Sequence, residues 1–148
     1  MGFSNIADGL YAVKKTVFED KKFSLADLSQ WLSDDWMDAE DKQTYMLNKI
    51  EKYGNDVDEV DEMARKVADH FCDVLAKYKN FRGGAYWPGI FSVGFHITMG
   101  AFTAATPDGR FAGDTLGNGI PPSNGQAQAG PTAIMNSVTK LPLTRIFN

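Results

Sequence analysis

The first half of the chain carries apolar residues at helical intervals. Between residues 4 and 19, Ile6, Leu10, Val13 and Val17 recur at steps of three and four, which places them on one face of a helix. The most regular stretch follows Asp56, and its apolar positions are Val57, Val60, Ala64, Val67, Phe71, Val74 and Tyr78. The pattern predicts two amphipathic helices, the second about six turns long with Asp56 as its N-cap.

Two shorter helices are expected between these. Ser24 and Asp38 belong to the residue types that cap helix N-termini, so they predict helices over about 25–36 and 39–51. The apolar anchors of this region are Trp31, Trp36, Tyr45, Leu47 and Ile50.

The pattern changes at residue 80, because glycine or proline then recurs every few residues and no long helix fits. Residues 90–99 alternate in a way that predicts a strand. The strand would carry Phe91, Val93 and Phe95 on one face, and Ser92, Gly94 and His96 on the other.

Two local signals follow the predicted strand. Thr106-Pro107-Asp108-Gly109 predicts a type I turn, since proline suits the second position and glycine the fourth. Gly130-Pro131 predicts the start of a short helix that ends near Thr139. The expected fold class is therefore mixed α/β, with amphipathic helices first, then one or two strands, long Gly/Pro loops and a short helix.

Charge is distributed unevenly between the two halves. Residues 80–148 hold only 6 of the 34 charged residues but 11 of the 14 glycines. We therefore divide the chain into a helical segment, 1–79, and a strand-and-loop segment, 80–148. The second is expected to need cover from elsewhere.

Composition excludes several classes of function. The net charge of −4 offers no clustered basic surface for nucleic acid or an anionic membrane. No apolar run approaches the roughly 18 residues that span a bilayer, and the start of the chain does not resemble a secretion signal. One cysteine and no Cys/His cluster predict neither a disulfide nor a metal site. The expected compartment is the cytoplasm.

An acidic cluster invites a calcium-site interpretation, and it comprises Asp56, Asp58, Glu59, Asp61 and Glu62. The EF-hand loop requires glycine at its sixth position, where this chain has Asp61. Carboxylates in a first helical turn, favoured by the helix dipole, explain the cluster better.

A series of motifs gives the chain a family resemblance. In order, these are Tyr53-Gly54-Asn55-Asp56, Asn80-Phe81-Arg82-Gly83-Gly84 with Pro88-Gly89, Ser92-Val93, Thr106-Pro107-Asp108-Gly109-Arg110 with Ala112-Gly113, Gly130-Pro131-Thr132-Ala133, and Ser137-Val138-Thr139-Lys140-Leu141. In sequence and spacing they resemble an internal part of the glycyl-radical enzymes, the family of pyruvate formate-lyase and the diol dehydratases. The resemblance covers nearly the whole chain and implies an incomplete part of one ten-stranded barrel domain.

The resemblance also implies a chemistry. Family members keep a radical on a backbone glycine, installed by a separate radical-SAM activating enzyme, and pass it to a cysteine that attacks a small-molecule substrate. Both loops are missing from this sequence, and we expect them before Met1 and beyond Asn148. We therefore expect no catalytic residue and no bound cofactor in this chain.

Neither radical partner is present in another form. Cys72 lies within the long predicted helix, whereas the family's cysteine occupies a tight loop after a glycine. Val93-Gly94-Phe95 lacks the arginine of the family's radical loop and precedes the TPDGR motif instead of following it.

The resemblance implies roles for other residues. Val93, and by alternation Phe91 and Phe95, would line the substrate pocket, although ordinary barrel core is an equally open interpretation for Val93 and the favoured one for the phenylalanines. His96 is expected to be a hydrogen-bonded structural imidazole, and His70 to be surface or packing. The motif residues Arg82, Gly83, Gly84, Thr106, Pro107, Asp108, Gly109 and Arg110 are expected to be structural. Asp108 would bond to its own turn, and Arg110 to a neighbouring carbonyl or carboxylate.

Two functional hypotheses follow. The first is a segment of a glycyl-radical enzyme, inactive alone, whose parent cleaves a C–C, C–O or C–N bond. Arg82-Gly83-Gly84 and Pro88-Gly89 favour the dehydratase, lyase and decarboxylase branch over pyruvate formate-lyase itself. Its partners would be the rest of the enzyme chain, the activating enzyme and a small substrate, in a homodimer of the cytoplasm or a bacterial microcompartment. The second is a non-catalytic helical scaffold derived from such an enzyme.

Overall fold

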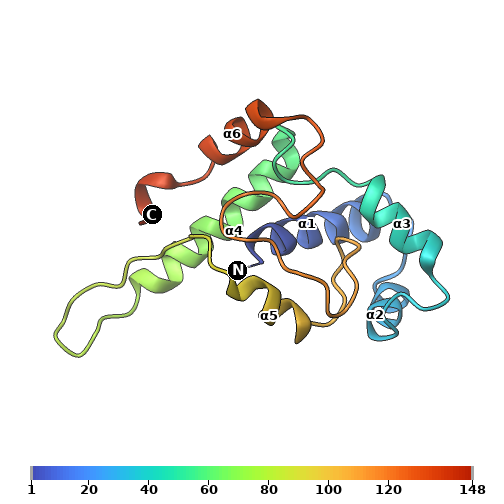
Figure 1. The fold of residues 1–148 in the computed structure, drawn as a ribbon, viewed down its shortest axis with the longest axis horizontal. Helices are drawn as coiled ribbons and strands as arrows, with labels where there is room; N and C mark the ends of the chain where they lie inside the picture. The colour runs from blue at the N-terminus through green and yellow to red at the C-terminus, as the bar shows by residue number, and fades with distance from the viewer. Residues whose placement is uncertain (1, 148) are drawn as a thin grey trace.

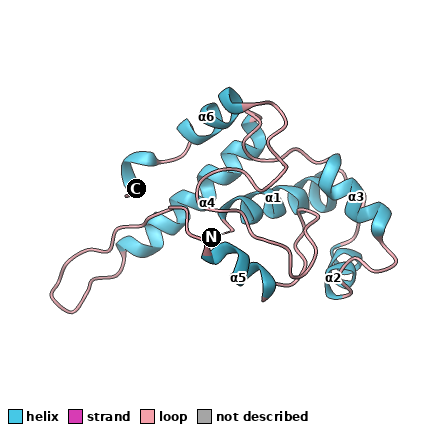
Figure 2. Ribbon diagram, viewed as in Figure 1, coloured by secondary structure: helices cyan, strands magenta, loops and turns pink. Residues whose placement is uncertain are grey.

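Two neighbouring helices, α1 (Phe3–Val13) and α4 (Asp58–Ala76), form the centre of the computed structural model, which describes residues 2–147 (Figure 1). Four further α-helices occur in this range: α2 (Leu25–Ser33), α3 (Glu40–Asn48), α5 (Phe95–Ala101) and α6 (Pro131–Thr139). A π-helical turn, Lys14–Glu19, continues α1, and a 3₁₀ turn, Leu143–Arg145, follows α6. Loops make up most of the second half (Figure 2). None of the helices described is long and apolar enough to cross a membrane.

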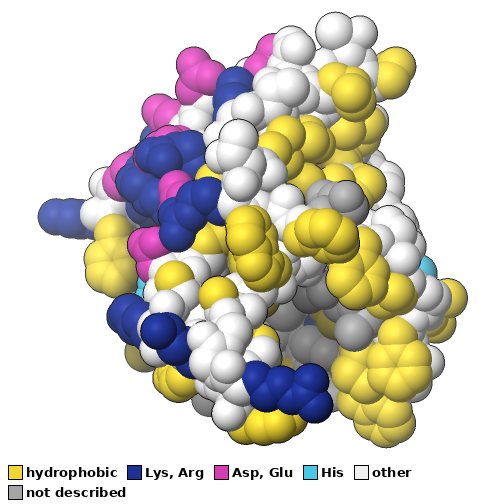
Figure 3. Space-filling model, turned by 90° about the vertical axis from the view of Figure 1, so that its left-hand side faces the viewer, with side chains coloured by type: hydrophobic (Ala, Val, Ile, Leu, Met, Phe, Trp, Pro, Cys, Tyr) yellow, Lys and Arg dark blue, Asp and Glu magenta, His cyan; other side chains and the backbone are white. Residues whose placement is uncertain are grey.

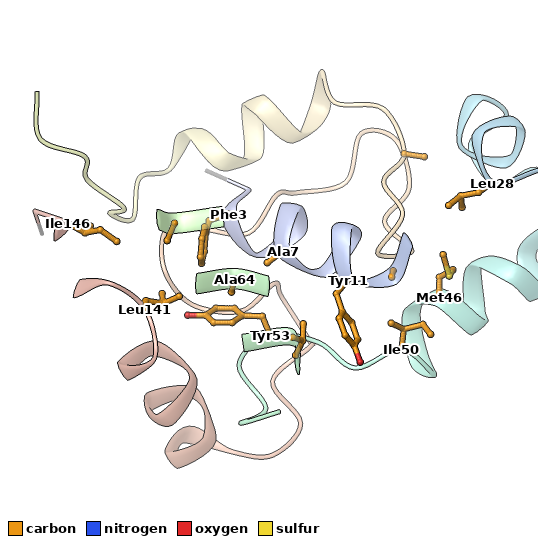
Figure 4. Packing of buried hydrophobic residues seen from close by; sticks show 14 of the residues in the cluster. Phe3, Ala7, Tyr11, Leu28, Met46, Ile50, Tyr53, Ala64, Leu141 and Ile146 are labelled. Atoms are coloured by element: carbon orange, nitrogen blue, oxygen red, sulfur yellow. The ribbon is translucent and has the colours of Figure 1, made fainter. Parts of the chain in front are cut away.

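Small side chains allow α1 and α4 to pack closely. The buried core includes Ala7 and Ala12 from α1 and Ala64 and Ala68 from α4, each no more than 1% exposed. Larger rings fill the space beside them: Phe3 and Tyr53 meet edge to face, with centroids 5.7 Å apart, next to Ala64 (Figure 4).

The apolar face predicted for α1 is only partly correct, because Val13 and Val17 pack half-buried against the core but the first two residues of the row do not. Ile6 and Leu10 are 51% and 48% exposed, whereas Phe3, Ala7 and Tyr11 are buried. Both rows repeat at the helical period, and the core forms on the row that combines Ala7 with the two aromatic rings. Since α1 is apolar on two sides, its outer row is a surface suited to a further layer of protein.

Helix starts were predicted with mixed success. The Ser24 hydroxyl accepts a hydrogen bond from the Asp27 amide at 3.0 Å, so Ser24 is confirmed as the cap of α2. Asp38 and Asp56 are not caps, because α3 begins at Glu40 and α4 at Asp58, after Ala39 and Val57 respectively. Both aspartates have positive φ angles, near 59°, which belong to the loops before the helices.

The strand predicted over residues 90–99 is also wrong. Residues 90–93 have no regular secondary structure and pair with no strand in the part of the chain that is described, and α5 occupies Phe95–Ala101. A strand requires a neighbour to take its backbone hydrogen bonds, and alternation of side chains cannot supply one. Phe91, Val93 and Phe95 therefore do not share a strand face.

An aromatic-rich surface surrounds the α4–α5 connection. Residues 77–88 project from the body as an arm (Figure 1). The exposed rings here and on the following segment are those of Tyr78, Phe81, Tyr86, Trp87, Phe91, Phe95 and Phe102. Seen from the end that carries the arm, charged side chains gather over one side and hydrophobic ones over the other (Figure 3).

The acidic start of α4 binds α6. Lys140 Nζ donates to carboxylates of Asp56, Asp58 and Asp61 at 2.8, 2.7 and 2.9 Å. The buried Ser137 hydroxyl accepts from the Asp56 amide and donates to Asp61 Oδ2, each at 2.9 Å. The described residues include no group of His, Cys, Asp or Glu that could hold a metal ion.

Ser137→Ala is expected to lower the free energy of unfolding by about 1–3 kcal/mol, because it removes a buried hydroxyl that serves two partners. Urea denaturation followed by circular dichroism measures the loss. Thr139→Ala is the matched control, since this exposed hydroxyl bonds only to Asn136 within α6. Equal losses in the two variants would contradict the role given to Ser137.

Candidate functional site

The TPDGR motif forms a tight turn whose side chains point back into the protein. The Thr106 amide donates to Arg110 O at 3.0 Å, and the Gly109 amide to Thr106 O at 3.1 Å. Asp108 does not bond to the turn backbone as predicted. Its Oδ1 accepts from the Thr106 hydroxyl, and its Oδ2 accepts from Asn5 Nδ2 of α1 at 2.7 Å. The turn is therefore joined to α1.

Arg110 holds backbone, as predicted. Its buried guanidinium donates to Asp114 O at 2.7 Å, to Thr103 O at 3.1 Å and to Ala104 O. Because these carbonyls lie on both sides of the turn, one side chain fixes the end of α5 relative to the loop that follows. Its Nε donates to the Thr106 hydroxyl at 3.2 Å, so each guanidinium nitrogen binds a group of the turn or of the chain beside it.

Helices α2 and α3 hold the outside of the turn. Trp36, fully buried after α2, donates from Nε1 to Arg110 O at 3.3 Å, and Gln43 Nε2 of α3 donates to Gly109 O at 2.5 Å. Gly109 has φ +96°, and a Cβ there would lie 2.9 Å from the Leu47 amide nitrogen. Only glycine meets both constraints without moving α3.

The predicted wall residues lie on the segment before the turn. Phe91 and Phe95 are 63% and 55% exposed, and Val93 is half-buried. The Val93 amide donates to Asn118 Oδ1 at 3.0 Å, and Val93 O lies 2.9 Å from Nδ1 of His96. The imidazole of His96 is thus hydrogen-bonded at the start of α5. The structure brings this segment together with the loop around Asn118, which the sequence did not single out.

The Arg82-Gly83-Gly84 motif forms the tip of the arm. Asn80 Oδ1 accepts from the amides of Arg82 and Gly84 at 2.9 and 3.0 Å, and the Arg82 guanidinium lies 5.1 Å from the Phe81 ring centroid. Figure 1 shows the arm at the opposite end of the molecule from α3, which contacts the TPDGR turn. The two motifs therefore do not form one site in the described residues.

Cys72 lies on the buried side of α4, with Sγ 3.9 Å from Arg145 O. Burial raises the pKa of its thiol above the ordinary value, which disfavours the thiolate that a nucleophile needs. This environment agrees with the structural role expected from the sequence.

The sequence did not single out Asp8, a buried carboxyl group beside the turn. Asp8 of α1 accepts from the Tyr53 amide at 2.7 Å through Oδ1, while its Oδ2 has no partner. Burial raises the pKa of Asp8 to about 7, opposed by the Tyr53 hydrogen bond and by the charge of Lys52. Burial likewise lowers the pKa of Lys52. In the sequence, the only sign of this buried acid is that Asp8 lies between apolar and small residues of α1.

A polar cavity of about 550 Å³ lies between α3 and the turn. Buried Gln43, Lys52 and Asp108 line it, and Arg110 closes one side. Most of these side chains are already bound to backbone or to each other, so the arrangement holds loops in place.

Comparison with known proteins gives consistent matches. The profile of the pyruvate formate lyase-like family matches residues 1–100. The chain is 38% identical to a probable dehydratase of Escherichia coli, over 99% of this chain and 19% of that protein. It superposes on the glycerol-bound B12-independent glycerol dehydratase from Clostridium butyricum with a TM-score of 0.92 and 43% identity, over 95% of this chain and 18% of that one. A glycyl radical enzyme from Archaeoglobus fulgidus matches with a TM-score of 0.92 and 30% identity, over 98% and 18%.

The chain thus spans about a fifth of the length of these relatives. Other curated relatives are named as lyases or as a decarboxylase. The match to solved structures includes the loops of the second half, since it extends over 95% of the chain.

Gly109→Ala is expected to destabilise the chain by about 2 kcal/mol more than Gly113→Ala. Both glycines have positive φ, but a Cβ at Gly113 would meet nothing within 4 Å. The difference in unfolding free energy between the two variants therefore isolates the contact with Leu47. Identical denaturation midpoints would show that α3 does not hold the turn.

Stability is expected to fall as pH rises from about 4 to 8, because Asp8 binds its proton more tightly in the folded chain, with a pKa of about 7 against an ordinary 3.8. Asp8→Asn should flatten this dependence and raise the free energy of unfolding at pH 8 by on the order of 2 kcal/mol. Urea titrations at pH 5 and 8 measure the effect, with exposed Asp114→Asn as the control. An unchanged pH dependence in the Asp8 variant would contradict the assignment.

Proposed function

Because this chain belongs to the pyruvate formate lyase-like family of glycyl radical enzymes, we propose that it works as one segment of such an enzyme, in the dehydratase, lyase and decarboxylase branch. The observation that carries the proposal is the superposition on a glycerol dehydratase at 43% identity, with a TM-score of 0.92. An agreement of this extent means that the loops, as well as the helices, have the shape they have in a complete enzyme.

The proposed reaction is radical cleavage of a C–O, C–C or C–N bond in a small molecule. The glycyl radical of the complete enzyme, installed by a radical-SAM activating enzyme, would supply the hydrogen-atom abstraction that starts it. The complete enzyme is proposed to be a cytoplasmic homodimer.

This chain would contribute support and one part of the pocket wall. Arg110 and Asp108 hold the turn and its neighbouring loops, and the segment with Phe91, Val93 and Phe95 would face the substrate. The exposure of the two phenylalanines, 63% and 55%, agrees with a surface that another part of the enzyme completes. Cys72, buried in α4, takes no part, so the chain alone is proposed to be inactive.

A graft tests the proposal. Residues 2–147 replace the matching segment of the Clostridium butyricum glycerol dehydratase, and the purified graft is treated with that enzyme's activating enzyme under anaerobic conditions. We expect a glycyl-radical doublet in electron paramagnetic resonance and measurable consumption of glycerol, because the segment reproduces the fold of the one it replaces.

The isolated chain treated in the same way is the control and should give no doublet. A glycyl doublet from the isolated chain would contradict its proposed role as a segment without the radical site. A folded, dimeric graft that takes up no radical would contradict the proposed function.

A further inference from the structure

The segment that would face the substrate is held by a side chain on a distant loop. Asn118 Oδ1 accepts from the Val93 amide at 3.0 Å, and the neighbouring Ser92 hydroxyl lies 3.5 Å from Asn118 O. His96 lies three residues after Val93, and its carbonyl oxygen accepts a hydrogen bond from the Leu116 amide at 3.4 Å. The loop of residues 116–118 therefore runs beside the wall segment at the point where α5 begins.

No strand pairs with the wall segment among the described residues, so a ladder of backbone hydrogen bonds does not set its position. The Val93 amide depends on one side-chain oxygen instead. A segment fixed in this way shifts when that oxygen is removed, whereas a strand within a sheet would keep its remaining ladder.

The loop itself is fixed on α1. The Gly117 amide donates to Asn5 Oδ1 at 2.7 Å, and Gly117 O accepts from the Gly2 amide at 2.8 Å. A Cβ at Gly117 would lie 2.0 Å from the Ser4 hydroxyl, so the loop approaches α1 as closely as glycine allows. Asn118 thus projects from a rigid support.

The same asparagine of α1 joins this support to the TPDGR turn. Asn5 accepts from Gly117 through Oδ1 and donates through Nδ2 to Asp108 at 2.7 Å. A continuous path runs from Asp108 through Asn5 to Gly117 by hydrogen bonds, along the chain to Asn118, and by a further hydrogen bond to Val93. The turn is therefore connected to the wall segment through α1 as well as through α5.

We infer that Asn118 is a positioning residue that sets where the Val93 segment lies and thereby how closely the enzyme fits its substrate. This inference rests on the proposed function, since it takes residues 91–95 as pocket wall. Asn118 would not touch the substrate, because its carboxamide oxygen is bound to backbone.

The test uses the active graft with three substitutions. Asn118→Ala removes the acceptor, Asn118→Asp keeps an oxygen in the same place, and Asn124→Ala is a matched control whose exposed amide meets only the Thr115 hydroxyl, at 3.4 Å. The measurements are radical content by electron paramagnetic resonance, and kcat and KM for glycerol.

Asn118→Ala is expected to raise KM by about five- to tenfold, the effect of one lost hydrogen bond, with radical content and kcat within about twofold of the graft. Asn118→Asp and Asn124→Ala should stay within about twofold in KM. An unchanged KM in Asn118→Ala, or equal loss of radical content in the Ala and Asp variants, would overturn the inference and leave the proposed function standing.

A second measurement does not depend on activity. In the graft, hydrogen exchange read by mass spectrometry should show faster exchange of the Val93 amide in Asn118→Ala and not in Asn118→Asp. Unchanged exchange in Asn118→Ala would overturn the inference whatever the kinetics. A folded but inactive unsubstituted graft would overturn the proposed function and the inference together.

Discussion

The carboxamide of Asn5 is the interaction on which the arrangement of the two halves depends. It donates to Asp108 in the TPDGR turn and accepts from the Gly117 amide, and it is 95% buried on α1. Both loops it binds lie more than 100 residues further along the chain. Without these bonds, a buried carboxylate and a buried amide would lose their partners, which costs more than either bond contributes when formed. The position of two loops of the second half therefore depends on the first helix.

The sequence predicted the parts of the fold that have local causes. The Ser24 cap, the proline turn and the Gly130-Pro131 helix start each depend on a few adjacent residues, and each is confirmed. The long helix α4 is also confirmed, but its buried face continues from Ala64 through Ala68 and Cys72, and the predicted Phe71 and Tyr78 are exposed. The strand over 90–99 and the burial of Ile6 and Leu10 were wrong predictions. A strand needs a partner, and the packing of a neighbouring element decides which of two apolar rows on a helix is buried. Asp56 is not the N-cap of α4 that its residue type predicts; its carboxylate binds Lys140, 84 residues away.

The residues of the candidate site also divide into those that a local motif predicts and those that it does not. A motif with fixed spacing marked Arg110 and Asp108. The bonds of Arg110 to neighbouring carbonyls agree with the prediction, whereas Asp108 binds Asn5 and the Thr106 hydroxyl instead of its turn backbone. Asn5 and Asn118 had no comparable signal, because a single asparagine has no period and its importance comes from what folds against it. The burial of Asp8 was not predicted for a related reason. An acidic residue on a helix is expected to face solvent, and its burial follows only from the packing of the folded chain.

Single side chains take the place of a sheet throughout the second half. Asn55 binds four backbone groups, donating to Lys52 and Gln126 and accepting from Gln128 and Ala129. Asn80 closes the arm in a similar way, and Arg110 binds three carbonyls. A carboxamide or guanidinium presents several hydrogen-bonding groups in a fixed plane. One such residue can therefore hold two or more loop segments together. A loop held in this manner needs few charges and little regular structure, which is why residues 80–148 can combine 11 glycines with 6 charged residues and still have a defined shape. Such a surface leaves its aromatic side chains available for contact with the rest of an enzyme, and the position of each loop then depends on an identifiable residue.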